Sequence, residues 1–316
     1  MRHTTLTKTI RLWAVAALAA MALGACTDTG SLLPKSGGAP SEVVVGGDCA
    51  EAVGALLEQP LTGLPQPESA FDVRTLPTAK LDATLRLERN IVLTDIDPQR
   101  HTATTVRYER NVYARPQIII YVGSPSRQAL LRDLPHCHLD RLLLRHELAS
   151  YAPRLDSDTS ATARETARTF GCTIRLPKGM TLNKRGKDFM WFSDNDPRKM
   201  GNICLYTSEN RDSVMKANIK GETDAMYMAT VPGTTATETA PDSKGRRVTL
   251  RRGLWQMEGD AMGGPYMSRT LTLADGRTVV AEAFVFAPGE KKRDKMRMLE
   301  ASVATMTAVT DGKPQQ

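Results

Sequence analysis

Histidine is scarce in this sequence and is absent from its second half. Only five of the 316 residues are histidine, and none of them follows His146. A hydrolase with a serine or cysteine nucleophile needs a histidine base beside that nucleophile. A hydrolytic site of this kind built entirely from residues beyond 146 is therefore excluded.

The spacing of a metal motif is also missing, although metal-capable side chains gather in one place. His136, Cys137 and His138 precede a predicted helix, and His146 and Glu147 lie within it. Zinc needs three or four ligands that converge at about 2.0–2.3 Å from the metal, and this spacing matches no established motif. We expect these histidines to lie at the start of the helix and on the surface, and we expect no metal.

Glycine-rich nucleotide-binding motifs are lacking as well. Gly46, Gly47 and Asp48 follow a predicted strand and open a predicted helix, as phosphate-binding turns do. They match neither the G-x-G-x-x-G nor the G-x-x-x-x-G-K-[ST] pattern. A turn in which Asp48 caps the helix explains them, and no cofactor is predicted.

Cysteine is rare, with five residues in the chain. An oxidising compartment would permit two disulfides among four of them in any of three pairings. A fold of this size does not need such cross-links, so buried free thiols fit the sequence at least as well. The four residues are Cys49, Cys137, Cys172 and Cys204.

What the sequence does have at its start is an export signal. Basic residues precede an apolar run over residues 12–23, which is too short for a membrane span of about 20 residues. The run ends in Leu-Gly-Ala-Cys at residues 23–26, which resembles the lipobox of bacterial lipoproteins. We therefore predict a signal peptide over residues 1–25 and lipidation of Cys26, with two or more acyl chains giving stable membrane anchoring.

Residues 26–41 are rich in Gly, Ser, Thr and Pro and are predicted to form a flexible tether. Thr27 follows the lipidated cysteine, whereas Asp at this position retains lipoproteins in the inner membrane in well-studied sorting systems. We therefore expect the outer membrane, with the domain facing the periplasm or the cell surface. The expected partners are the membrane itself and an envelope protein, glycan or lipid, and not nucleic acid.

Strands dominate the rest of the chain, and helices bracket them. The class is α+β, with mainly antiparallel sheets flanked by helices, in two α/β segments over residues 42–155 and 156–310 and a tail over 311–316. The second segment is similar to the Mog1/PsbP type of fold. Strands are predicted at 42–45, 71–76, 91–96, 106–114, 117–122, 172–176, 188–192, 202–206, 225–231, 247–257, 266–273 and 278–286. Helices are predicted at 48–58, from Ser124 or Ser126 to 134, and at 139–151, 159–169, 212–218 and 290–307.

The predicted closing helix is amphipathic. One stripe is apolar and is expected to pack on the sheet; it consists of Met296, Leu299, Val303 and Met306. The other face is basic and is expected to stay solvated, available to an anionic partner or a membrane surface. The four residues of this expected basic face are Lys291, Lys292, Arg293 and Arg297.

Three stretches carry a resemblance to a known family. They are Gly-Leu-Pro-Gln-Pro-Glu-Ser-Ala-Phe-Asp-Val at 63–73, Arg-Asp-Ser-Val-Met-Lys-Ala-Asn-Ile at 211–219 and Arg-Gly-Leu-Trp-Gln-Met-Glu-Gly-Asp-Ala-Met-Gly-Gly-Pro at 252–265. With them the chain resembles the Bacteroidetes envelope lipoproteins of domain-of-unknown-function family 4837, from about Glu42 to Thr307. The resemblance implies a lipoprotein and brings no activity, ligand or catalytic residue.

The third stretch contains the best candidate for a ligand-facing site. A large aromatic residue and two acids precede paired glycines, which permit backbone conformations that other residues resist. The alternative is a bulged strand crossover that packs Trp255 in the core. The candidate residues are Trp255, Glu258, Asp260, Gly263 and Gly264.

Two functions are consistent with these patterns. The favoured hypothesis is a non-enzymatic envelope lipoprotein that binds another envelope component as an assembly or accessory factor. The alternative is an enzyme that acts on glycan, peptide or lipid with carboxylates such as Glu258 and Asp260. A deep cleft with converging acids would favour the enzyme, and a flat apolar patch or a basic face would favour binding.

Overall fold

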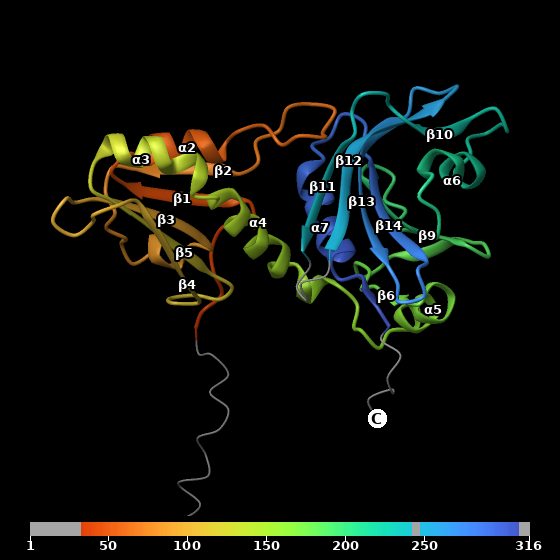
Figure 1. Ribbon diagram of the computed structural model, residues 1–316, viewed down its shortest axis with the longest axis horizontal. Coiled ribbons are helices and arrows are strands. Elements are labelled where there is room, and N and C mark those ends of the chain that lie inside the picture. The colour runs from red at the N-terminus through yellow and green to blue at the C-terminus, as the bar shows by residue number, and fades with distance from the viewer. Residues whose placement is uncertain (1–32, 242–246, 310–316) are drawn as a thin grey trace, which may run out of the picture.

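The computed structural model describes residues 33–241 and 247–309, and these residues fold around two large β-sheets, with a further two-stranded sheet (Figure 1). The predicted signal peptide, Cys26 and the tail over 311–316 lie outside the described residues. Within the described part of the chain, no helix is both long and apolar enough to cross a membrane.

The first sheet has five strands, which are mostly parallel. Their order across the sheet is β2-β1-β3-β5-β4, and only β4 at the edge runs antiparallel to its neighbour. Most of β5 is apolar and buried, as are Val43–Val45 of β1 and Ile91–Val92 of β3. The bounds are β1 (Glu42–Gly47), β2 (Asp72–Leu76), β3 (Asn90–Ile96), β4 (Thr105–Arg110) and β5 (Ile118–Ser124).

Helices pack on one face of this first sheet. Alternate strand residues such as Val45, Val92 and Ile120 share a buried cluster with Leu57 and Leu143 from the helices, because successive side chains on a strand point to opposite faces. The helices are α2 (Ala50–Leu57), α3 (Arg127–Asp133) and α4 (Leu139–Ser150), and the short 3₁₀ turns are Leu85–Leu87, Leu134–His136 and Ala152–Arg154.

The turn between β1 and α2 is a packed structural element. A Cβ atom on Gly47 would lie 2.1 Å from the backbone oxygen of Thr94, and φ at Gly47 is +103°, so only glycine fits. Asp48 does not cap the helix as predicted. Its carboxylate accepts a hydrogen bond from the Ile96 backbone N–H at 3.1 Å, and Cys49 occupies the N-cap position in a left-handed conformation.

Residues 33–41 belong to the first domain. Arg115 donates its backbone N–H to the carbonyl of Pro34 at 2.9 Å, and the Ser36 N–H donates to the carbonyl of Arg115 at 3.2 Å. Asn90 also donates from its side chain to the carbonyl of Pro40 at 2.9 Å. The predicted flexible tether is therefore wrong from residue 33 onward, because the backbone groups of this stretch find partners in the domain.

The second sheet has eight antiparallel strands. Seven follow the order β10-β12-β13-β14-β9-β8-β7, and β11 also pairs with β12. The two-residue strands β6 (Cys172–Thr173) and β15 (Thr307–Ala308) pair separately and join the two ends of the domain. The sheet strands are β7 (Thr181–Arg185), β8 (Phe189–Ser193), β9 (Met200–Tyr206), β10 (Tyr227–Thr230), β11 (Ala236–Pro241), β12 (Arg247–Glu258), β13 (Gly263–Thr272) and β14 (Thr278–Phe286).

Helices cover both faces of this second sheet. On one face, α7 (Arg293–Ala304) packs the predicted apolar stripe into a core with α5 (Ala161–Phe170). Met296, Leu299, Val303 and Met306 are all buried there, so this prediction is confirmed. On the opposite face, α6 (Arg211–Asn218) contributes Met215 to a second core.

The predicted α+β class with mainly antiparallel sheet is confirmed by these two sheets. The parallel order of the first sheet was not anticipated. Figure 1 shows the two domains side by side, with α4 of the first beside α7 of the second. The four cysteines of the described chain are free thiols, and Cys49, Cys172 and Cys204 are buried.

Candidate functional site

The segment predicted to face a ligand forms a strand hairpin. Trp255 is buried in the core, with 2% of its surface exposed, and its indole N–H donates to the carbonyl of Val285 at 3.3 Å. A Cβ atom on Gly264 would lie 2.0 Å from that same carbonyl oxygen. Trp255 pairs with Gly264 across the hairpin and Gln256 with Gly263. The paired glycines therefore permit close strand packing around Trp255. Its core position agrees with the alternative interpretation, but the segment is a regular antiparallel hairpin and not a bulged crossover.

The two acids of this segment bind within their own hairpin. Glu258 accepts a hydrogen bond from the Gln256 side chain at 2.7 Å. Asp260 is exposed and accepts from the backbone N–H of Ala261 at 2.6 Å. These contacts account for both carboxylates as parts of a surface turn.

The expected basic face of the closing helix is largely inside the protein. Lys292, Arg293 and Arg297 have 5%, 7% and 3% of their surface exposed, and only Lys291 is exposed. The prediction of a solvated face is therefore wrong for three of its four residues. It failed because the first domain packs on this side of α7, and the amphipathic pattern of one helix cannot reveal a neighbouring domain.

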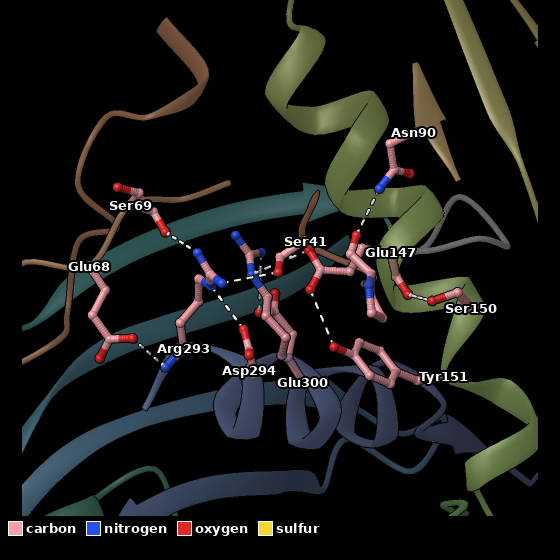
Figure 2. A network of polar contacts seen from close by, with 12 residues as sticks. Ser41, Glu68, Ser69, Asn90, Glu147, Ser150, Tyr151, Arg293, Asp294 and Glu300 are labelled. Atoms are coloured by element: carbon pink, nitrogen blue, oxygen red, sulfur yellow. Dashed lines mark hydrogen bonds and ion pairs between the residues drawn. The ribbon is translucent and has the colours of Figure 1, made fainter. Parts of the chain in front are cut away.

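Arg293 joins the two domains through several hydrogen bonds (Figure 2). Its Nη2 lies 2.6 Å from Asp72 Oδ2 and 3.0 Å from Ser41 Oγ, and its Nη1 donates to the carbonyl of Ser69 at 2.9 Å. The hydrogen bond from Arg293 lowers the pKa of Asp72. Burial works against the charge on Arg293, but Asp72 and Asp294 outweigh it, so the pKa of Arg293 is raised. The charged forms of both groups are thus favoured at the interface.

The first turn of α7 is capped by a residue of the first domain. Glu68 accepts hydrogen bonds from the backbone N–H groups of Lys292 at 2.7 Å and Arg293 at 3.1 Å (Figure 2). The first N–H groups of a helix have no partner within the helix, and a carboxylate there also complements the helix dipole. The position of α7 relative to the first domain is therefore fixed by backbone as well as by side-chain contacts.

A third group of contacts connects α4 with α7. Glu147 is fully buried, accepts from the Tyr151 hydroxyl at 3.4 Å, and lies 3.8 Å from Arg297 Nε. Burial raises the pKa of Glu147 to about 7, and the positive charge of Arg297 only partly offsets this. The Arg297 guanidinium also lies 5.9 Å from the centre of the Phe71 ring. A carboxyl group that titrates near neutral pH thus lies inside the domain interface.

We call this set of contacts the interdomain junction. Glu300 of α7 connects this junction with the second sheet. It accepts a hydrogen bond from Arg252 of β12 at 3.2 Å and lies 3.9 Å from Arg297. A hollow of about 250 Å³ opens beside the junction and is lined by Ser41, Tyr151 and Asp294 among others. The junction consists of Ser41, Glu68, Asp72, Glu147, Tyr151, Arg293 and Arg297.

A second buried ion pair lies on the opposite face of the second sheet, beneath α6. Arg211 Nη2 is 2.8 Å from Glu282 Oε1, with 8% and 0% of the two side chains exposed. Tyr206 donates its hydroxyl to Glu282 at 2.8 Å, and the Arg211 guanidinium lies 3.9 Å from the centre of the Tyr266 ring. Sequence reasoning missed this pair, although one acid within the apolar strand Thr278–Phe286 was a signal for it.

The metal-capable residues around α4 do not converge. His136 and His138 are exposed before the helix, as predicted, whereas His146 is buried at 6% exposure. The expectation of a surface position is wrong for His146 because it lies on the inner side of α4. In the described part of the chain, no group of three or more His, Cys, Asp or Glu residues is placed to hold a metal ion.

These features define a two-domain protein in which a small, mostly parallel α/β domain is fixed to a larger antiparallel α+β domain. Residues 159–305 match the family model DUF4837, described as a domain of unknown function. The predicted resemblance is thus supported over the second domain. Residues 40–150 match a different family model, DUF8532, which is also described as a domain of unknown function.

Three solved structures show distant likenesses to this chain. No curated protein matches the chain. A point mutant of the protein Mog1 is 10% identical with a TM-score of 0.29, over 45% of this chain and 92% of that one. The Saccharomyces cerevisiae Ran-binding protein Mog1p is 10% identical with a TM-score of 0.29, over 44% and 90%. The human StarD13 lipid transfer and protein localization domain is 11% identical with a TM-score of 0.19, over 48% and 95%.

Proposed function

We propose that this protein is a lipid-anchored envelope protein that binds another envelope component as one two-domain unit and does not catalyse a reaction. The interdomain junction carries this proposal. Arg293 alone contacts three first-domain residues, Ser41, Ser69 and Asp72. Hydrogen bonds and ion pairs between two domains fix the relative position of their outer surfaces. A fixed arrangement of these surfaces reduces the entropy lost on binding a partner.

The enzyme alternative has less support. A carboxyl group with a pKa near 7 is typical of catalytic acids and bases, and Glu147 has such a pKa. Its side chain, however, is enclosed between α4 and α7 and has no exposed surface. Glu258 and Asp260, the acids proposed from sequence, are bound within a surface hairpin. These positions suit structure rather than attack on a substrate.

Anchoring rests on the lipobox at residues 23–26, and it is tested by Cys26→Ser. We expect the parent chain to incorporate a palmitate analogue and to sediment with membranes. The variant should incorporate none, because serine offers no thiol for the diacylglycerol. Equal labelling of the two proteins would overturn lipid anchoring.

Binding as a unit is tested by Arg293→Ala. We expect the parent to unfold in one calorimetric transition and the variant in two, because each domain has its own core and the variant loses the contacts with Ser41, Ser69 and Asp72. Amine-reactive cross-linking in intact cells should trap a partner with the parent and recover less of it with the variant.

The matched control is Arg198→Ala. Arg198 binds Glu290 just before α7, but the pair is exposed, with 81% and 41% of the side chains accessible. Exposed pairs contribute about 0–1 kcal/mol, so this variant should behave like the parent. If the parent and the Arg293→Ala variant trap equal amounts of partner, binding as a unit is contradicted. If the parent traps no partner, the binding role itself is contradicted.

A further inference from the structure

An arginine-rich and tyrosine-rich surface surrounds the hairpin between β4 and β5. Tyr108 and Tyr113 are 45% and 41% exposed and are among the most exposed large hydrophobic residues of the described chain. Arg110 lies 5.4 Å from the ring of Tyr108, and Arg86 lies 5.8 Å from the ring of Tyr113. Arg115, at the base of the same hairpin, is also exposed.

The chain enters the first domain at this surface. Lys35 pairs with Arg115 in an isolated bridge, and the Arg115 N–H donates to the carbonyl of Pro34 at 2.9 Å. Figure 1 shows the start of the described chain beside β4. We define the arginine–tyrosine surface as Lys35, Arg86, Tyr108, Arg110, Tyr113 and Arg115.

The distance from the lipidation site limits how the domain can face the membrane. Cys26 lies seven positions before Leu33, and seven fully extended residues span at most about 25 Å. A domain of roughly 100 residues has a radius of gyration of about 13 Å and is therefore on the order of 35 Å across. The surface where the chain enters is thus held nearest to the lipid headgroups.

We propose that the arginine–tyrosine surface docks on an anionic lipid membrane and orients the whole protein on it. This inference rests on the lipidation of Cys26 proposed above. Guanidinium groups bind phosphate with paired hydrogen bonds, and an anionic leaflet attracts basic residues close to the anchor. Tyrosine is enriched at membrane interfaces because its ring is apolar and its hydroxyl is polar. The surface offers both kinds of side chain next to the chain's entry point.

The charge of the hairpin supports an anionic surface as the occupant. Arg107 lies on β4 beside this surface and is the residue that pairs with the nearby acid, Glu109, at 2.8 Å. Three further arginines of this surface are exposed. Arg86 and Arg110 contact the rings of Tyr113 and Tyr108, and Arg115 forms hydrogen bonds through its backbone. Arg293 and Arg297 of α7, by contrast, are buried in the interdomain junction and do not reach a membrane.

The test uses the mature lipoprotein reconstituted into vesicles. Tyr113→Cys carries a polarity-sensitive fluorophore, and Ala217→Cys on α6, at the opposite end of the molecule from β4 (Figure 1), is the matched control. With phosphatidylglycerol in the vesicles, we expect the fluorescence emission of the label at position 113 to shift to the blue and to be quenched by brominated lipid. The emission of the label at position 217 should not change. The parent protein measures background labelling of the half-buried Cys137.

Charge reversal separates this docking from simple anchoring. Arg110→Glu combined with Arg115→Glu should abolish the shift at position 113 while the protein still floats with the vesicles. Arg168→Glu combined with Lys187→Glu should leave the shift at position 113 unchanged, because both residues are exposed in the second domain, away from this surface. Near-ultraviolet circular dichroism checks that each variant is folded.

The outcomes distinguish the two proposals. An anchored protein with no shift at position 113, or with an equal shift in neutral phosphatidylcholine vesicles, would overturn the docking and leave the anchoring intact. Palmitate labelling of Cys26→Ser equal to that of the parent would overturn the anchoring itself. Loss of the shift at high salt would support electrostatic docking, since exposed charges are screened by added ions.

Discussion

The Glu282→Ala variant should lose about 3–5 kcal/mol of unfolding free energy, the loss typical of removing one partner of a buried ion pair. Arg211 is 8% exposed and Glu282 is 0% exposed. Without the Glu282 carboxylate, the buried guanidinium keeps only the largely exposed Asp212, at 3.2 Å, as an opposite charge. The Tyr206 hydroxyl also loses its acceptor. Urea denaturation of the parent and the variant would measure the difference.

A double variant tests the cause of this loss. Arg211→Met combined with Glu282→Leu removes both charges, and apolar replacements of a buried pair are often neutral or stabilising. We expect the double variant to recover most of the loss. If Glu282→Ala unfolds at the same urea concentration as the parent, or if the double variant is the less stable of the two, the pair does not act as described.

The stability of Glu147→Gln and His146→Gln should depend on pH in opposite directions. Burial raises the pKa of Glu147 from 4.5 to about 7. Between these two pKa values the folded state keeps a proton on Glu147 that the unfolded state releases. The contribution of Glu147 to the unfolding free energy is therefore fully present below pH 4.5. It is lost as pH rises from 4.5 to about 7, by about 3 kcal/mol, because one pKa unit corresponds to about 1.4 kcal/mol.

His146 has the reverse effect. Burial, assisted by the positive charges of Arg110 and Arg89, lowers its pKa from 6.5 to about 4. The unfolded state binds the proton first, so the contribution of His146 is present above pH 6.5 and is lost as pH falls to about 4, again by about 3 kcal/mol. The two neighbouring residues should nearly cancel in the parent between pH 4.5 and 6.5.

The variants expose each contribution separately. His146→Gln leaves Glu147, so its stability should fall as pH rises through this range. Glu147→Gln leaves His146, so its stability should fall as pH decreases. Urea midpoints at pH 4.5 and 6.5 would measure this, and curves parallel to the parent would contradict the shifted pKa values. The charged groups that act on Glu147 are Arg297, Arg293, Asp294 and Glu300, and those that act on His146 are Arg110 and Arg89.

Much of the fold followed from local patterns. The apolar stripe of Met296, Leu299 and Val303 and the predicted strand at residues 278–286 were placed correctly because each pattern is repeated within a single element. Parallel pairing of β1 with β2 and β3 was not predictable in the same way. It depends on which distant segments meet, and strand hydrophobicity alone does not specify a partner.

The junction was missed for a related reason. Arg293 and Arg297 carry charges that a single helix pattern assigns to solvent, and their partners Asp72 and Glu147 lie more than a hundred residues away. The glycines at 263 and 264 were correctly recognised as special, but the close approach of the Val285 carbonyl comes from a neighbouring strand. Contacts across domains and sheets are therefore the part that local sequence does not encode.

The pairing of β6 with β15 brings the start of the second domain to its end, so this domain is complete only once residues 307 and 308 are in place. Cys172 meets Ala308 and Thr173 meets Thr307, so the first strand of this domain waits for nearly the last residues of the chain. The strands of the first domain, by contrast, all come from residues 42–124, and domains tend to fold in the order in which they emerge. The strands of the first domain are thus all available before α7, and Glu68 and Asp72 gain their second-domain partners only when Lys292 and Arg293 are in place.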